Sequence, residues 1–211
     1  MARYSPDYGA YAFKQIVGTK PKGISEQNMR SGIKAILSKW ARNVQAENVQ
    51  RLRNATAMNG DAMRPLSRLW SLYKNVAGLS PEIGQATGKM LQEHGSAKNI
   101  RIDMKGDAIT VTIAPCQTPE TLKKIQWFQS AWKQTVKSEK PGAMQRKLEI
   151  MAEQAGIKDS RIVYEIGFGI FADNIVVLNH PARRWIKGSE KWDRWAQDEI
   201  AHLMLTGRRR I

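Results

Sequence analysis

A change in hydrophobic period divides the chain and limits the folds open to it. From Ser25, a typical N-cap residue, apolar residues recur at steps of three and four, the period of a helix with one buried face. Lys34, Lys39 and Arg42 fall at other positions around the same helix. The pattern predicts a long amphipathic helix that ends near residues 59–60. Its apolar positions are Met29, Ile33, Ile36, Leu37, Trp40 and Val44.

The period changes in IRIDMKGDAITVTIA, residues 100–114. Apolar residues alternate with polar ones on both sides of a turn at residues 105–107, which predicts a β-hairpin. The stretch RIVYEIGFGIFADNIVVL, residues 161–178, is rich in β-branched and aromatic residues and contains a turn signal at residues 172–174, which indicates two more strands.

Further helices are predicted around these strands. A short helix is expected after Pro65, and another from the Ser-Pro-Glu at residues 80–82 to Gly95. A helix should begin at residues 118–120 and continue to about Val136, and another should run from about residue 143 to 155. The last helix follows Ser189.

This order of elements predicts an α+β fold. We expect one domain over residues 24–211, in which a small antiparallel sheet is packed by a long N-terminal helix and a C-terminal helix. The block at about 116–158 interrupts the order as a helical insertion.

Residues 1–23 are rich in Tyr, Gly and Pro and have no sustained period, which predicts an extended N-terminal arm. Aromatic anchors carry much binding energy per residue, so the arm could pack on its own domain or reach a neighbouring subunit. The expected anchors are Tyr4, Tyr8, Tyr11 and Phe13.

The charge balance points to polyanions as partners. The 211 residues include 34 Lys and Arg but 19 Asp and Glu, a net charge of +15, so acidic side chains cannot offset the basic surface. A basic surface without a specific partner is the alternative. No apolar run approaches the roughly 18 residues that a membrane helix requires, so we expect a soluble protein of the cytoplasm with no membrane partner.

No motif indicates catalysis, a metal or a cofactor. The glycines of GTKPKGIS, residues 18–25, lack the lysine of a phosphate-binding loop, and GFGIFA, residues 167–172, precedes a strand where a dinucleotide site needs a helix. Cys116 has no histidine nearby in sequence, and the three histidines are scattered. We therefore expect a protein that is not an enzyme and takes no cofactor or metal.

The stretch HPARRWIKGSEKWDRWAQDEI, residues 180–200, combines a strand stop at Pro181 with the start of the last helix. Helical spacing assigns Trp192 and Trp195 to the core. Folding does not explain Arg183 and Arg184, so we expect them to contact a neighbouring subunit or DNA. The same expectation covers the basic tail, Arg208, Arg209 and Arg210.

This stretch resembles the C-terminal signature of the virion morphogenesis, or tail-completion, proteins of Mu-like tailed phages. Two more segments fit in the family's order: MRPLSRLWSLYKN, residues 63–75, is similar to its Pro-Leu segment ending in lysine, and ATGKMLQEHG, residues 86–95, looks like its Thr-Gly-Lys-Leu turn before the sheet. The matching residues are Pro65, Leu66, Lys74, Thr87, Gly88, Lys89, Leu91, Pro181, Ala182, Arg183, Trp185, Gly188, Ser189 and Trp192.

The resemblance implies a structural protein of the virion neck or head-proximal tail end, assembled in the host cytoplasm. It would form a ring, expected to be a hexamer, that completes the tail and joins it to the head with the help of neighbouring neck and tail proteins. DNA in the central channel would meet the basic protomer through nonspecific electrostatics. Two other classes stay open: a sequence-nonspecific DNA-binding protein, and a small hydrolase or nuclease whose active-site residues the sequence does not reveal.

Overall fold

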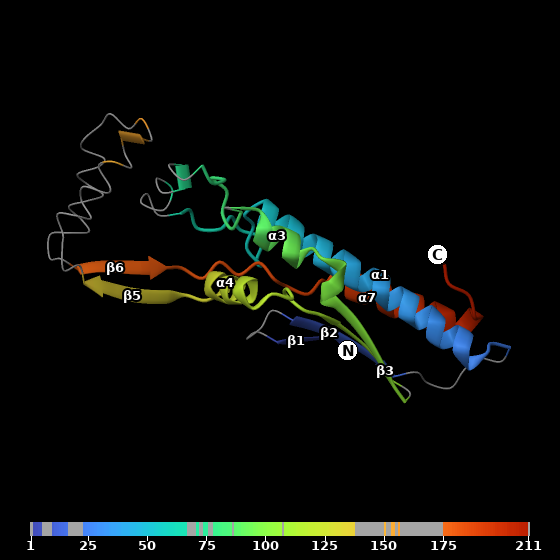
Figure 1. The fold of residues 1–211 in the computed structure, drawn as a ribbon. Coiled ribbons are helices and arrows are strands. Elements are labelled where there is room, and N and C mark those ends of the chain that lie inside the picture. Colours follow the sequence, from blue (N-terminus) through green and yellow to red (C-terminus); the bar gives the residue numbers. More distant parts are fainter. Residues whose placement is uncertain are drawn as a thin grey trace.

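The computed structural model places two long helices side by side over one face of a sheet (Figure 1). It describes residues 2–5, 10–16, 23–66, 71, 74–75, 78–85, 87–106, 108–137, 150, 153–154, 156 and 175–210. The helices and two antiparallel sheets form the predicted α+β fold, with the long N-terminal helix and the C-terminal helix in their predicted places.

Helix α1 (Glu26–Arg53) is the longest element and supplies much of the core. The hydroxyl of its N-cap, Ser25, accepts a hydrogen bond of 3.1 Å from the amide of Asn28, which satisfies one of the first amides of the helix. All six predicted apolar positions are buried. The helix ends at Arg53 rather than near residues 59–60, because Ala55 has a φ of +49° and the chain turns into a bridge between Thr56 and Ala62.

Strands β1 (Ala2–Ser5), β2 (Ala10–Ile16), β3 (Ile100–Lys105) and β4 (Ala108–Ile113) form an antiparallel sheet in the order β1-β2-β4-β3. The predicted hairpin is the β3–β4 pair, whose register matches Ile102 with Val111. Ile109, Val111 and Ile113 of β4 are buried beneath α1. Because β2 pairs along the whole of β4, the N-terminal segment packs on its own domain, the first of the two alternatives for the arm.

The helix predicted to start at residue 81 is wrong over its first half. The chain makes turns there, and α3 covers only Lys89–His94, followed by the 3-10 turn η1 (Ala97–Asn99). Gly88 precedes α3 with a φ of +71°, a conformation that glycine adopts without steric cost. The proline at position 81 lies outside any helix, just before the turn at residues 83–84.

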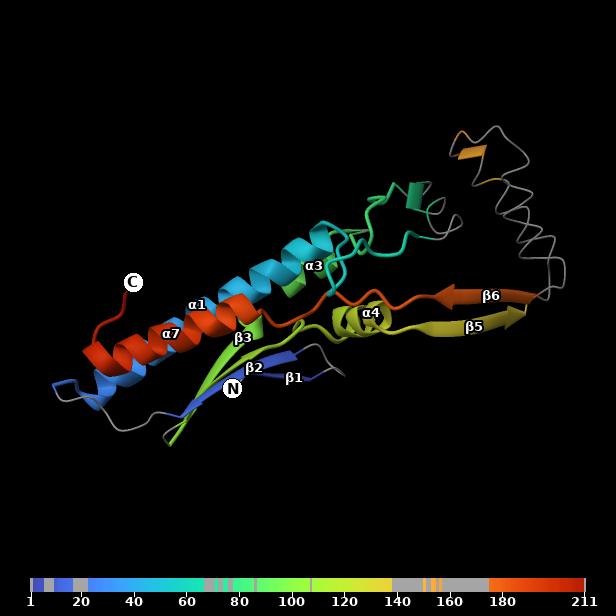
Figure 2. The same ribbon diagram turned by 180° about the vertical axis from the view of Figure 1, so that it is seen from behind.

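The helix predicted from residue 118 begins as expected but is too long. Helix α4 (Pro119–Gln129) stops at Ser130, and strand β5 (Trp132–Lys137) follows, paired antiparallel with β6 (Ile175–His180) as a two-stranded sheet. β-branched and aromatic residues in WKQTVK suit a strand as well as a helix, and pairing with β6 decides between them. The β5–β6 pair extends beyond α4, away from the larger sheet (Figures 1 and 2).

Most of the predicted helices at 65–75 and 143–155 and the first predicted strand within 161–178 lie outside the described residues. Helix α7 (Glu190–Thr206) is the predicted C-terminal helix, with Ser189 at the N-cap position, although its side chain makes no capping hydrogen bond. It runs antiparallel along α1 (Figure 2). A Cβ on Gly32 would lie 2.7 Å from a methyl of Leu203, so this glycine permits the close approach.

Candidate functional site

Arg183 stands at the centre of the junction where the chain passes from β6 towards α7. Its guanidinium donates hydrogen bonds of 2.9 Å to the carbonyl oxygens of Arg64 and Pro65, and it lies 5.7 Å from the ring centroid of Phe128. The side chain is only 5% exposed, and burial lowers the pKa of the guanidinium. The expectation that folding leaves Arg183 unexplained is therefore wrong: it ties three chain segments together inside its own protomer.

Trp185 forms the apolar side of the same junction. It is fully buried and meets Phe128 edge to face at 5.5 Å and His94 at 6.0 Å between ring centroids. Such aromatic pairs contribute about 0.5–1.5 kcal/mol each beyond the area they bury. The ring thus connects α3, α4 and the segment before α7.

Asn48 of α1 was missed by sequence reasoning and holds the same segment in place. Its side-chain amide donates to the carbonyl of Lys187, and its oxygen accepts the Lys187 amide at 2.9 Å. Arg51 donates to that oxygen as well. A polar residue on the buried face of a predicted helix is the signal that could have identified it.

Arg184 and the C-terminal arginines are exposed, but the structure does not bring them together. The carbonyl of Arg184 accepts the Met58 amide beyond the C-terminal end of α1. Arg208, Arg209 and Arg210 follow Gly207, where an added Cβ would collide with Ile24, just before α1 begins. Since α1 has 28 residues, these two groups are separated by about 40 Å.

The predicted aromatic anchors fall in the N-terminal strands. Tyr4 of β1 pairs with Tyr11 of β2, and Phe13 of β2 pairs with Val111 of β4. Tyr8 lies outside the described residues. The backbone pairing gives this segment a place in the protomer's own sheet.

Cys116 and His94 come close in the fold, but their environment opposes nucleophilic catalysis. The His94 Nδ1 donates to the carbonyl of Pro115 at 2.8 Å, and burial lowers the pKa of this imidazole. The thiol donates to the Thr118 carbonyl, and burial, helped by the Glu93 carboxylate, raises its pKa. A reactive cysteine needs the opposite shift, so this pair packs rather than reacts.

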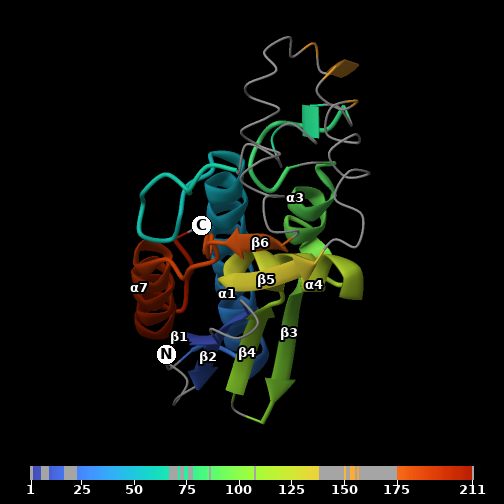
Figure 3. The same cartoon turned by 90° about the vertical axis from the view of Figure 1, so that its left-hand side faces the viewer.

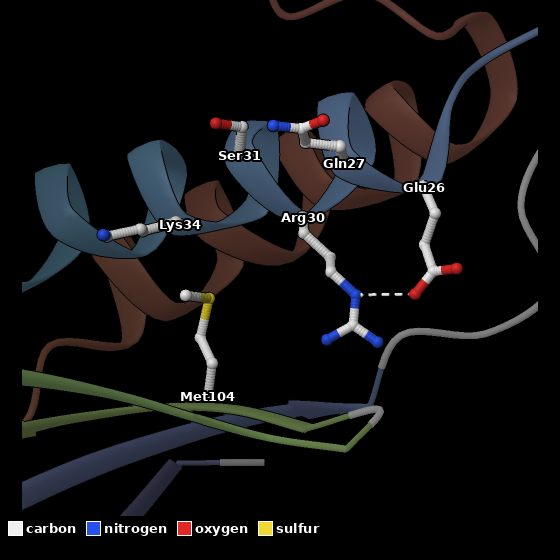
Figure 4. A pocket seen from close by; sticks show the side chains of 6 residues that line it. All are labelled: Glu26, Gln27, Arg30, Ser31, Lys34 and Met104. Atoms are coloured by element: carbon white, nitrogen blue, oxygen red, sulfur yellow. Dashed lines mark hydrogen bonds and ion pairs between the residues drawn. The ribbon is translucent and has the colours of Figure 1, made fainter.

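A pocket of about 530 Å³ opens between the N-terminal half of α1 and β3 (Figure 4). The Arg30 side chain extends into it and donates hydrogen bonds of 2.8 Å to the Glu26 carboxylate and 2.7 Å to the Gly106 carbonyl. Met104 points up from the sheet and is 51% exposed. Gln27, Ser31 and Lys34 line its rim. Among the lining residues Glu26 is the one carboxylate, and it is already paired with Arg30.

The described part of the chain contains no cluster of three or more His, Cys, Asp or Glu side chains that could hold a metal ion. None of its helices combines the length and apolar character needed to cross a bilayer. Comparisons with protein-family models, with characterised proteins and with solved structures found no match to this chain.

Proposed function

We propose that this chain is a non-enzymatic structural protein of a tailed-phage virion, located at the neck or head-proximal tail end. In this role it forms a ring, with a hexamer as the expected order, that completes the tail and joins it to the head around the DNA channel. Assembly takes place in the host cytoplasm with neighbouring neck and tail proteins.

One observation carries the proposal: segments that resemble the family, although far apart in sequence, meet in the fold. Arg183 of the Pro-Ala-Arg element holds the carbonyls of Arg64 and Pro65 in the Pro-Leu segment. Lys74, at the end of that segment, is buried and donates to the carbonyl of Glu82, and its pKa is lowered by burial. Because residues of one motif hold the backbone of another, the motifs would be expected to occur together in a single protein.

The Thr-Gly-Lys-Leu turn supports the same arrangement. Gly88 provides the left-handed turn from which α3 begins, and α3 carries His94, whose ring meets Trp185 edge to face, as does the ring of Phe128. The three segments therefore contribute to one structural unit at the C-terminal end of α1.

The test is the mass of the purified protein, alone and on isolated tail tubes, by native mass spectrometry and electron microscopy. A closed ring at the tube end is expected, and DNase treatment should not change it. A strict monomer that also fails to bind tail tubes would contradict the proposal. Measuring on the tube matters, because some rings assemble only there.

A sequence-nonspecific DNA-binding protein is the second candidate. It is favoured by exposed cations on α1, among them Lys34 and Arg42, that make no ion pair within the described part of the chain. This candidate requires a monomer or dimer, indifferent to tail tubes, whose DNA affinity falls steeply with salt.

A further inference from the structure

The solvent-facing side of α1 carries four exposed cations, Lys34, Lys39, Arg42 and Arg53, which we call the basic stripe. At 100° per residue they fall within about 140° of the helix circumference, and at 1.5 Å per residue they span about 28 Å. The two acids of α1, Glu26 and Glu47, lie outside this arc. Figure 1 shows α1 above the sheet, and Figure 3 shows α7 and α3 on either side of α1.

The stripe differs from the other cations of α1 in its lack of acidic partners. Arg30 pairs with Glu26, and Arg51 pairs with Glu47. No member of the stripe makes an ion pair within the described residues, and the Lys39 ammonium lies 5.2 Å from the ring centroid of Trp195. These four charges are therefore not neutralised by nearby acids of their own protomer.

Three acids on the elements beside the stripe make hydrogen bonds within the fold. Glu47 accepts the Trp192 indole N–H at 2.8 Å, and Asp193 accepts that of Trp40 at the same distance. On the α3 side, Glu93 accepts a hydrogen bond from Thr118 and pairs with Lys89. Their carboxylates thus bind groups where α1 packs against its neighbours, and they do not neutralise the cations on its outer face.

We propose that the basic stripe binds the phosphate backbone of duplex DNA. A rigid row of about 28 Å approaches one turn of B-DNA, along which roughly one negative charge occurs every 1.7 Å of axis. The α1 residues between the cations include Ser38, Ala46 and Val49. None of them is aromatic, and they are too few and too small to give the apolar depth of a membrane-bound helix. The inference rests on the proposed function: in the proposed ring, the basic stripe marks the side of the protomer that faces the DNA channel.

The test uses the full chain with Lys34, Lys39, Arg42 and Arg53 all replaced by Gln. The matched control replaces Lys98, Lys105, Lys123 and Lys124 by Gln; these are exposed on other elements, and the change in net charge is the same. Circular dichroism first checks that both fold. Binding to a 30-base-pair duplex of random sequence is then measured by fluorescence anisotropy from about 50 to 200 mM salt.

The slope of log K against log salt should fall in magnitude by about 3–4 for the stripe variant, because each lost phosphate contact removes about 0.9, and should change little for the control. Equal losses in both variants, or none in either, would overturn the proposal. Native mass is recorded on the same samples. A stripe variant that loses DNA and still forms rings, in solution or on isolated tail tubes, supports both proposals. DNA loss combined with a parent chain that stays monomeric and fails to bind tail tubes supports the stripe and contradicts the ring.

Discussion

The two ends of α1 use similar residues in opposite ways. At its C-terminal end, Arg183 is buried against carbonyl groups and Trp185 is enclosed by aromatic rings. At its N-terminal end, Arg30 borders an open pocket, and Arg208 and its two neighbours extend into solvent. One end is closed by its own chain, and the other leaves Arg208, Arg209 and Arg210 exposed.

In this protein, therefore, the type of a residue does not show whether it stabilises the fold or is exposed on the surface. Adjacent arginines at 183 and 184 differ completely, since the first is 5% exposed and the second is exposed. Substitutions of buried residues at the closed end should therefore change stability, and substitutions of exposed residues at the open end should change assembly or binding.

Trp185→Ala should destabilise the protein by about 3–5 kcal/mol, because it removes a fully buried ring and leaves a cavity among Phe128 and His94. Urea unfolding monitored by circular dichroism measures the loss. Trp127→Ala is the control: that ring is 55% exposed on α4, and its removal should cost about 0.5 kcal/mol or less. Similar losses in the two variants would mean that the junction is not closed.

Arg183→Ala should cost about 1–3 kcal/mol, because the buried guanidinium is lost and the partly buried carbonyls of Arg64 and Pro65 lose their donor. Arg184→Ala removes the same side chain one residue later and should stay within about 0.5 kcal/mol. The pair is compared in thermal and urea unfolding. If Arg184→Ala proves the more damaging change, the assignment of the two arginines is reversed.

Acidification should weaken the closed end through His94. Burial depresses the pKa of this imidazole from its ordinary 6.5, so the unfolded chain binds the proton more readily than the folded one. The contribution of His94 is fully retained above about pH 6.5 and is lost as the pH falls through the folded-state value.

The measurement is the unfolding free energy between about pH 5 and 7.5, a window above the ordinary range of carboxylates. In His94→Asn, which cannot titrate, the decline over this window should be shallower even if the variant is less stable throughout. An unchanged slope would assign the acid sensitivity to other groups.

The smallest effect on stability is expected at the open end. Replacing Arg208, Arg209 and Arg210 together by Ala should leave the unfolding free energy within about 0.5 kcal/mol, since all three are exposed after the C-cap of α7. If the variant no longer forms rings on tail tubes but keeps its stability, the three C-terminal arginines belong to a subunit interface. A large loss of stability would place them in the fold.

Deleting residues 1–23 does not separate an effect on assembly from an effect on folding, as it would if these residues formed an independent arm. β2 pairs with β4 from Tyr11 to Ile16, so its removal strips the backbone partner from a central strand of the sheet. Smaller changes are therefore better probes of whether the N-terminal residues also reach a neighbouring subunit.

Periodicity predicted α1, the β3–β4 hairpin and α7, because each buries one face and its apolar residues therefore recur at a regular spacing in the sequence. It failed at α3 and at the end of α4. There, a turn residue with positive φ and a strand partner distant in sequence decided the structure, and neither belongs to the local pattern. Of the predicted site residues, Arg184 and the terminal arginines are exposed, and their contact with a neighbouring subunit or DNA stays a prediction, whereas Arg183 is buried inside its own protomer.

The sequence by itself therefore determined the class of fold, the helix faces and the excess of positive charge, because these depend on residue type and spacing alone. Only the tertiary structure decided which cations are available. Arg183 became an internal donor because the carbonyls of Arg64 and Pro65, more than a hundred residues away, lie within 2.9 Å of it. Lys34 and Arg42 stayed free of ion pairs within the described residues because the nearby acids found indole, hydroxyl and guanidinium partners in the seams of the fold.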